Sequence, residues 1–124
     1  MANILLVEDN KNQCLLYEQE LRHEGYDIVT ANDGKEALEK IKGQQPDMII
    51  MDICLPKMDG VEAMRHILSK SKSRDIPIII NTGYSNYKDN FMTWAADAYI
   101  VKSSDLTELK NKIEELLTNK YIDV

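Results

Sequence analysis

The sequence predicts an α/β fold, a doubly wound three-layer sandwich in which five parallel strands form one open sheet between two layers of helices. Apolar runs and amphipathic segments alternate five times along the 124 residues, in units of about 20 to 25 residues. The apolar runs are short and rich in Ile, Val and Met, as expected for strands that are buried on both faces. Because no linker or low-complexity segment interrupts the pattern, we expect residues 1–124 to form a single domain.

The apolar runs define the five predicted strands. These strands cover residues 4–7, 26–30, 48–51, 76–80 and 98–101. The second strand offers only Thr30 and Ala31 at its carboxyl end, which is expected of a strand at the edge of the sheet.

Helical patterns follow the strands and carry recognisable start and stop signals. Gly25 suits the residue just beyond the end of the first helix. Asp33–Glu36 and Asp59–Glu62 both have the spacing of a capping box, which predicts that the second and third helices start there. A weaker fourth helix is predicted over 85–95, and the leucine-rich segment Leu106–Leu117 predicts a fifth.

Composition and charge narrow the range of partners. The net charge of −6, from 21 acidic and 15 basic residues, argues against nucleic acid or an anionic membrane surface as the main partner. No apolar stretch approaches the ~20 residues of a membrane span, and we expect a cytoplasmic protein. Cys14 and Cys54 are separated by 39 residues without a CxxC motif, which argues against a zinc site or a disulfide.

The polar residues that end the strands predict where the functional site lies. In such sheets ligands bind beyond the carboxyl ends of the strands. Those ends carry three carboxylates, one hydroxyl and one ammonium, from Glu8, Asp9, Asp52, Thr82 and Lys102. At ~4 Å, like charges near a protein surface repel by roughly 4 kcal/mol per pair. Three clustered carboxylates therefore call for a hard cation with oxygen ligands, such as Mg²⁺.

This set of residues resembles the receiver domain of two-component response regulators, and the resemblance covers essentially the whole chain. The acidic pair, Asp52, Thr82 and Lys102 fall at the family's spacing, and the loop LPKMDG at 55–60 matches the family's loop. Tyr99, three residues before Lys102, matches its aromatic switch position. The resemblance implies a flavodoxin-like (βα)5 topology with strand order 2-1-3-4-5.

The resemblance also implies a chemistry for the site. Asp52 would be the phosphoacceptor, attacking a phosphohistidine on a sensor histidine kinase or a histidine phosphotransferase. Lys102 would contact one phosphoryl oxygen as a point charge, and the Thr82 hydroxyl would donate to another. Apart from this phosphotransfer and autodephosphorylation, we expect no enzymatic activity.

A magnesium site is implied at the same place. Asp9, Asp52 and the backbone carbonyl of Cys54 would hold the ion, with Glu8 acting directly or through water. Oxygen ligands of this kind suit Mg²⁺.

Signalling would proceed by a two-state switch. Movement of Thr82 toward the phosphoryl group would leave space for Tyr99 and change the face formed by the fourth helix, fifth strand and fifth helix. A downstream protein target would read that face, including Lys110, and the protein would be a monomer or weak dimer. The phosphodonor would instead cover the strand-end loops and the first helix, around Asn10, Gln13, Cys14 and Tyr17.

The sequence departs from the family pattern at one position. Ser103 replaces the proline that usually follows the lysine through a cis bond, so the isomer of the Lys102–Ser103 bond stays open.

Three alternative functions also remain open. A flavin or nucleotide carrier would need a loop of backbone hydrogen-bond donors at the positions of Glu8 and Asp9. A dehalogenase-type phosphatase would need an Asp where Cys54 stands. A pseudo-receiver, used only for binding, typically lacks one of the five site residues. The chain is either a standalone regulator or part of a longer protein.

Overall fold

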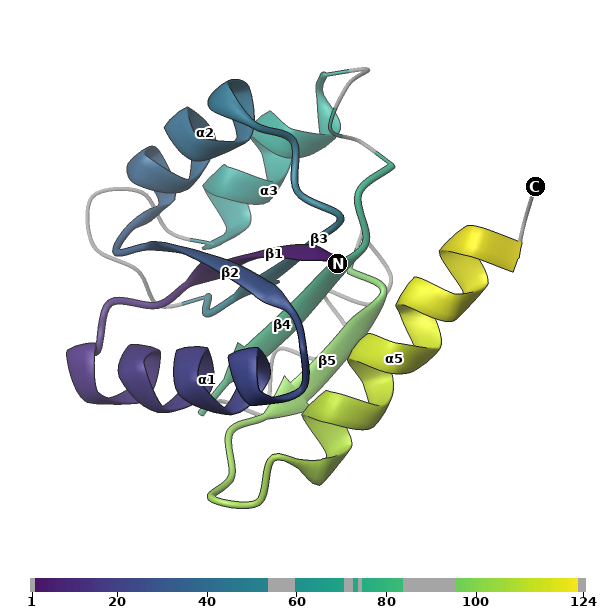
Figure 1. Ribbon diagram of the computed structural model, residues 1–124. Coiled ribbons are helices and arrows are strands. Elements are labelled where there is room, and N and C mark those ends of the chain that lie inside the picture. Colours follow the sequence, from purple (N-terminus) through teal and green to yellow (C-terminus); the bar gives the residue numbers. More distant parts are fainter. Residues whose placement is uncertain (1, 54–59, 71–72, 74, 84–95, 123–124) are drawn as a thin grey trace.

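Five parallel strands form the centre of the molecule, in the order β2-β1-β3-β4-β5 (Figure 1). The structure is a computed structural model and describes residues 2–53, 60–70, 73, 75–83 and 96–122. The strands are β1 (Asn3–Val7), β2 (Asp27–Ala31), β3 (Met48–Met51), β4 (Ile78–Thr82) and β5 (Ala98–Val101). The predicted strand order and the edge position of β2 are confirmed.

The fourth strand lies two residues later than predicted. Pro77 has no backbone N–H, so it cannot donate to the sheet, although its carbonyl accepts a hydrogen bond of 2.9 Å from Ile49. At the other end, Asn81 and Thr82 still pair with β5, and the strand therefore ends at Thr82. This extension brings Thr82 into the sheet instead of the following turn.

Helices cover both faces of the sheet, as the sequence predicted. Figure 1 shows α1 and α5 on one face and α2 and α3 on the other. The described helices are α1 (Lys11–His23), α2 (Gly34–Gly43), α3 (Gly60–Leu68) and α5 (Thr107–Ile122). The predicted fourth helix, 85–95, lies outside the described residues. In the part of the chain that the structure describes, no helix is long and apolar enough to cross a membrane.

The end of α1 confirms the role predicted for Gly25. Gly25 has a φ of 100°, a conformation that glycine adopts without a steric penalty. Its N–H donates to the carbonyl of Arg22 at 3.0 Å, and the N–H of Tyr26 donates to the carbonyl of Leu21 at 3.2 Å. These two bonds form a Schellman motif, which turns the chain back into β2.

The start of α2 confirms the other predicted signal. The Asp33 side chain caps the helix by accepting a hydrogen bond of 2.8 Å from the backbone N–H of Glu36. The corresponding cap proposed at Asp59 lies outside the described residues.

Alternate residues of each strand pack into two apolar cores, one on each face of the sheet. Leu5, for example, belongs to the core under α2 and α3, whereas Leu6 belongs to the core under α1 and α5. Burying one such side chain stabilises the fold by about 1.5–3 kcal/mol. The strand ends are therefore firmly held, which makes them a rigid platform for polar groups.

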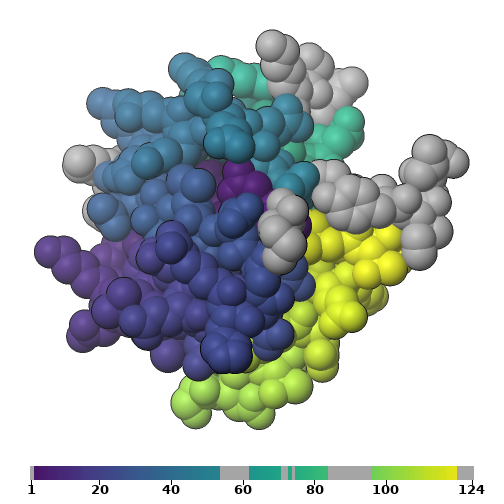
Figure 2. All heavy atoms as spheres, in the orientation of Figure 1, coloured from purple at the N-terminus to yellow at the C-terminus, as the bar shows by residue number. Residues whose placement is uncertain are grey.

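Salt bridges also join α1 to α5 across the surface. The Lys110 ammonium lies 3.0 Å from the Glu20 carboxylate and 3.3 Å from that of Glu24. In Figure 2 the side chains of these two helices form neighbouring parts of one surface. Lys110, which we expected on a face for a downstream target, therefore contacts α1 in this structure.

Candidate functional site

The register of the sheet brings the predicted site residues together. Val7 of β1 pairs with Met51 of β3, so Glu8 and Asp52 follow side by side, one residue beyond the paired strands. Side chains alternate along a strand, and both residues continue the series that faces α1 and α5. Lys102 continues the same series after β5. The three charged side chains consequently meet under the first turn of α1.

Lys102 is the centre of the site. Its ammonium lies 2.6 Å from Asp52 Oδ2 and 2.7 Å from Glu8 Oε1. It also donates to Gln13 Oε1 at 2.6 Å. An ammonium has three donor hydrogens, and these three acceptors can engage all of them. The side chain is therefore held in one position directly beside the Asp52 carboxylate.

Burial shifts the pKa values of the charged groups in this cluster. Glu8 is only 2% exposed, and desolvation raises its pKa even though the hydrogen bonds from Lys102 and from the backbone N–H of Asn10 oppose the shift. Burial alone would lower the pKa of Lys102, but its hydrogen bonds to Asp52 and Glu8 together outweigh that effect and raise it. Lys102 is thus a permanent cation that compensates buried negative charge.

The acidic cluster has the composition of a magnesium site. Carboxylate oxygens of Glu8, Asp9 and Asp52 all lie within 4.8 Å of one another, and Asp9 is exposed. They border an open cleft of about 760 Å³ that Lys102 also lines. Three carboxylates and one ammonium leave a net negative charge that a divalent cation would neutralise. The ligand set fits Mg²⁺, which favours oxygen ligands and retains some of its water. The predicted ligand at Cys54 lies outside the described residues.

Thr82 ends β4 and directly precedes Gly83, which lines the cleft. Its backbone carbonyl accepts a hydrogen bond of 2.7 Å from the N–H of Lys102, which joins the two residues through the backbone. Its side chain is fully buried, and Oγ1 has no hydrogen-bond partner within the described parts of the protein. A buried hydroxyl without a partner costs about 1–3 kcal/mol. This atom is consequently suited to accepting or donating a bond that another ligand would complete.

Tyr99 is buried on the other face of the sheet, at 8% exposure. Its neighbour across the β4–β5 ladder is Ile80, and both belong to the core under α2 and α3. Thr82, two residues beyond Ile80, continues the same face by alternation. Tyr99 and Thr82 are therefore close neighbours in the sheet, whereas Tyr99 is not part of the charged cluster.

The structure also corrects and extends the sequence-based picture. The Lys102–Ser103 bond, whose isomer was open, is trans, because the described residues contain no cis peptide bond. Tyr17, which we expected on a donor-binding surface, is 3% exposed and packs in the core. Gln13 was not predicted as a partner of Lys102. Its place in the first turn, three residues after the capping Asn10, was the available signal.

Fold and site together define a class of protein, a doubly wound domain with an acidic cluster and a lysine at the carboxyl edge of a parallel sheet. The chain belongs to the response regulator receiver domain family, whose sequence profile matches residues 4–114. The response regulator ArlR of Staphylococcus epidermidis is 40% identical over 119 residues, which cover 94% of this chain and 53% of ArlR. The chain thus spans about half the length of the curated relatives it matches.

Solved structures show the same similarity. TrrA, a response regulator of Thermotoga maritima crystallised with Mg²⁺ and BeF, is 43% identical and superposes with a TM-score of 0.86 over 94% of this chain and 99% of that one. TrrA in complex with the histidine kinase ThkA gives 44% identity and a TM-score of 0.85 over the same shares. The protein is a receiver domain of two-component signalling, as its sequence indicated.

Proposed function

We propose that Asp52 accepts a phosphoryl group from a phosphohistidine of a histidine kinase or histidine phosphotransferase. The observation that carries this proposal is the 2.6 Å contact between Asp52 Oδ2 and Lys102, inside a cluster of three carboxylates. Asp52 directly follows β3, the middle strand of the five. The structure of the relative TrrA with a histidine kinase supports this kind of donor.

The transfer would be a displacement at phosphorus. One Asp52 carboxylate oxygen forms a bond to phosphorus while the bond from phosphorus to the donor histidine nitrogen breaks and its electrons return to the imidazole. Such reactions depend on positioning and on neutralising charge more than on covalent assistance. Lys102 supplies a fixed positive charge beside the acceptor, and Thr82 Oγ1 supplies a hydrogen-bonding group that has no partner among the described residues. We also propose autodephosphorylation, in which a water oxygen forms a bond to the same phosphorus while the bond from phosphorus to the Asp52 oxygen breaks, so that inorganic phosphate leaves and the carboxylate is restored.

Magnesium would be held by Asp9 and Asp52, with Glu8 close by and the backbone carbonyl of Cys54 as a further ligand. When bound, Mg²⁺ would neutralise charge on the phosphoryl oxygens and the carboxylates. Asp9 is the exposed member of the cluster, so it offers the ion an approach from solvent. The presence of Mg²⁺ and BeF in the TrrA structure supports this assignment.

Phosphorylation would then change a protein-binding surface. Thr82 and Tyr99 lie on the same face of neighbouring strands, so a shift of Thr82 toward the phosphoryl group would alter the space beside Tyr99. We propose that a downstream protein reads the resulting change along β5 and α5, together with the predicted fourth helix. We also propose that residues 1–124 act as one domain, as a monomer or weak dimer.

The deciding experiment is to incubate the protein with Mg²⁺ and acetyl phosphate, a small phosphodonor, and to measure its intact mass. The wild-type protein should gain one phosphoryl group, and Asp52→Asn should gain none while keeping its circular dichroism spectrum. Asp75→Asn removes an exposed aspartate before β4 and is the matched control. Phosphorylation of Asp52→Asn at the wild-type level would reject the proposal. A wild-type protein that stays unmodified would favour the pseudo-receiver alternative.

A further inference from the structure

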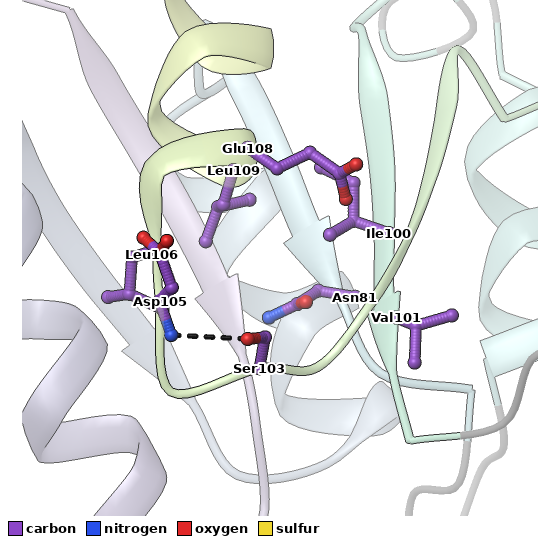
Figure 3. A pocket seen from close by; sticks show the side chains of 8 residues that line it. All are labelled: Asn81, Ile100, Val101, Ser103, Asp105, Leu106, Glu108 and Leu109. Carbon is purple, nitrogen blue, oxygen red and sulfur yellow. Dashed lines mark hydrogen bonds between the residues drawn. The ribbon is translucent and has the colours of Figure 1, made fainter.

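A second cleft lies on the face of the sheet that α5 covers, between the ends of β4 and β5 and the start of α5. It has a volume of about 230 Å³, which corresponds to the liquid volume of about seven or eight waters (Figure 3). The cleft is therefore large enough for one long side chain. Its apolar walls include Ile100, Leu106 and Leu109, and its polar groups are those of Asn81, Ser103, Asp105 and Glu108.

Asn81 is the unusual member of this lining. It is only 4% exposed, yet its side-chain amide makes no hydrogen bond with any residue that the structure describes. Figure 3 shows this amide directed into the cleft, toward Ser103 and Asp105. Among the described residues, only Asn3 Oδ1 and Thr82 Oγ1 are fully enclosed side-chain polar atoms without a partner, so the Asn81 amide is accessible from the cleft. This amide can therefore hydrogen-bond a ligand that enters the cleft.

The charges around the cleft identify the kind of ligand. Asp105 and Glu108 contribute two carboxylates, and no basic side chain lines the cleft among the described residues. The start of α5 does not attract an anion either, since Asp105 already accepts hydrogen bonds from the N–H and the hydroxyl of Thr107, at 2.9 and 2.6 Å. A positively charged ligand group that donates hydrogen bonds is consequently favoured over an anion or a hydrogen-bond acceptor.

We propose that this cleft binds an arginine side chain of a protein partner. The guanidinium, which has only donors, would donate to the Asn81 carbonyl oxygen and to the Glu108 carboxylate. The aliphatic part of the arginine would lie against Ile100 and Leu106. We assign the arginine to a polypeptide because the free amino acid would bring an additional carboxylate to a cleft lined by Asp105 and Glu108. This proposal is independent of the phosphorylation of Asp52.

The test is an NMR titration of the ¹⁵N-labelled full chain with acetyl-arginine amide, which represents an arginine inside a polypeptide. We expect saturable shifts of the Asn81 side-chain amide and of the backbone amides of Ser103 and Glu108. Acetyl-citrulline amide, a neutral isostere of the same length, should cause no saturable shift. Glu108→Gln should weaken binding about two- to fivefold, the range of one exposed ion pair. Asn81→Ala should weaken it by about fivefold, from the loss of one buried hydrogen bond.

Controls separate the cleft from other acidic surface. Glu114→Gln changes the same charge at an exposed position further along α5 and should leave the titration unchanged. If Asn81→Ala does not fold, Glu108→Gln still decides the matter, because Glu108 is exposed. The proposal is overturned if these amides do not shift, if citrulline binds equally well, or if Glu108→Gln binds as tightly as the wild type. Shifts of the same amides with protein concentration alone would assign the cleft to a second copy of the chain and also overturn it.

Discussion

The Lys102 ammonium lies 2.6 Å from Asp52 Oδ2, so the cation assigned to a phosphoryl oxygen already contacts the proposed acceptor before any phosphoryl group is present. Its other two donors point to Glu8 and Gln13. To bind a phosphoryl oxygen, Lys102 must give up one of these acceptors. The neutral Gln13 is the weakest of the three, because hydrogen bonds to charged groups are stronger.

Removal of the Gln13 acceptor should therefore speed phosphorylation. Gln13→Ala leaves the two carboxylates to position Lys102 and frees one donor, which removes the cost of breaking a hydrogen bond of about 0.5–1.5 kcal/mol. We expect acetyl phosphate to modify this variant about two- to tenfold faster than the wild type, measured by intact mass against time. Gln19→Ala, at an exposed position of the same helix, is the control. A slower reaction would show that Gln13 is needed to hold Lys102 in place.

The Thr82 hydroxyl should lower the stability of the protein while it supports phosphorylation. Thr82→Val replaces a buried hydroxyl without a described partner by a methyl group of similar shape, and should raise the free energy of unfolding by about 1 kcal/mol in a denaturant titration. Thr82→Ser keeps the hydroxyl and loses a methyl, so it should lower that free energy by about 1 kcal/mol. With acetyl phosphate, the serine variant should accumulate more phosphorylated protein than the valine variant. Equal accumulation in both variants would contradict a role for the hydroxyl.

The positions of the strand ends could be predicted from sequence, and with them most of the site. Buried parallel strands read as short apolar runs, so the residues that follow each run must meet at one edge of the sheet. This reasoning predicts that Glu8, Asp52 and Lys102 lie together, as the structure shows. The sequence predicts Thr82 just after its strand, whereas Thr82 lies within the strand because Asn81 and Thr82 still pair with β5.

Contacts between elements could not be predicted in the same way. The bond from Lys102 to Gln13 depends on how the first turn of α1 packs over the strand ends, which no local pattern specifies. Tyr17 shows the same limit, since its position near the site suggested a binding surface, whereas the packing of α1 on the sheet buries it in the core. The cleft at Asn81 depends on the path of the loop after β5, which the sequence does not reveal.

Glu8 should reduce the stability of the protein when the metal is absent. Burial raises its pKa, so the folded state holds this proton more tightly than the unfolded state, and stability falls as pH rises from 4.5 through the raised value. Glu8→Gln should therefore increase the free energy of unfolding at pH 7 in EDTA. Its advantage over the wild type should shrink on acidification, as Glu8 becomes neutral. Glu114→Gln, at an exposed position, should show neither effect, and a Glu8→Gln protein less stable than the wild type at pH 7 would contradict this account.

Asp9 should contribute to magnesium affinity more than to stability. We expect Asp9→Asn to weaken Mg²⁺ binding at least about tenfold by calorimetry, as is typical when a group that supports a metal site is changed. Without metal, the same substitution relieves repulsion within the acidic cluster, so the free energy of unfolding should not decrease. Asp75→Asn is again the matched control. Unchanged Mg²⁺ affinity in Asp9→Asn would remove Asp9 from the proposed ligand set.

Substitutions of Tyr99 test whether phosphorylation and the resulting change of the binding surface depend on different residues. It is buried on the face of the sheet opposite the charged cluster, so Tyr99→Leu should leave the rate of phosphorylation by acetyl phosphate within about twofold of the wild type. If Tyr99 carries the switch, the NMR shifts that phosphorylation causes along β5 and α5 should become smaller in Tyr99→Leu, because a population shift requires a residue that differs between the two states. Tyr99→Phe keeps the ring and serves as the control for packing. If Tyr99→Leu is phosphorylated poorly, but its phosphorylated fraction shows NMR shifts of wild-type size, Tyr99 takes part in the chemistry and not in the switch.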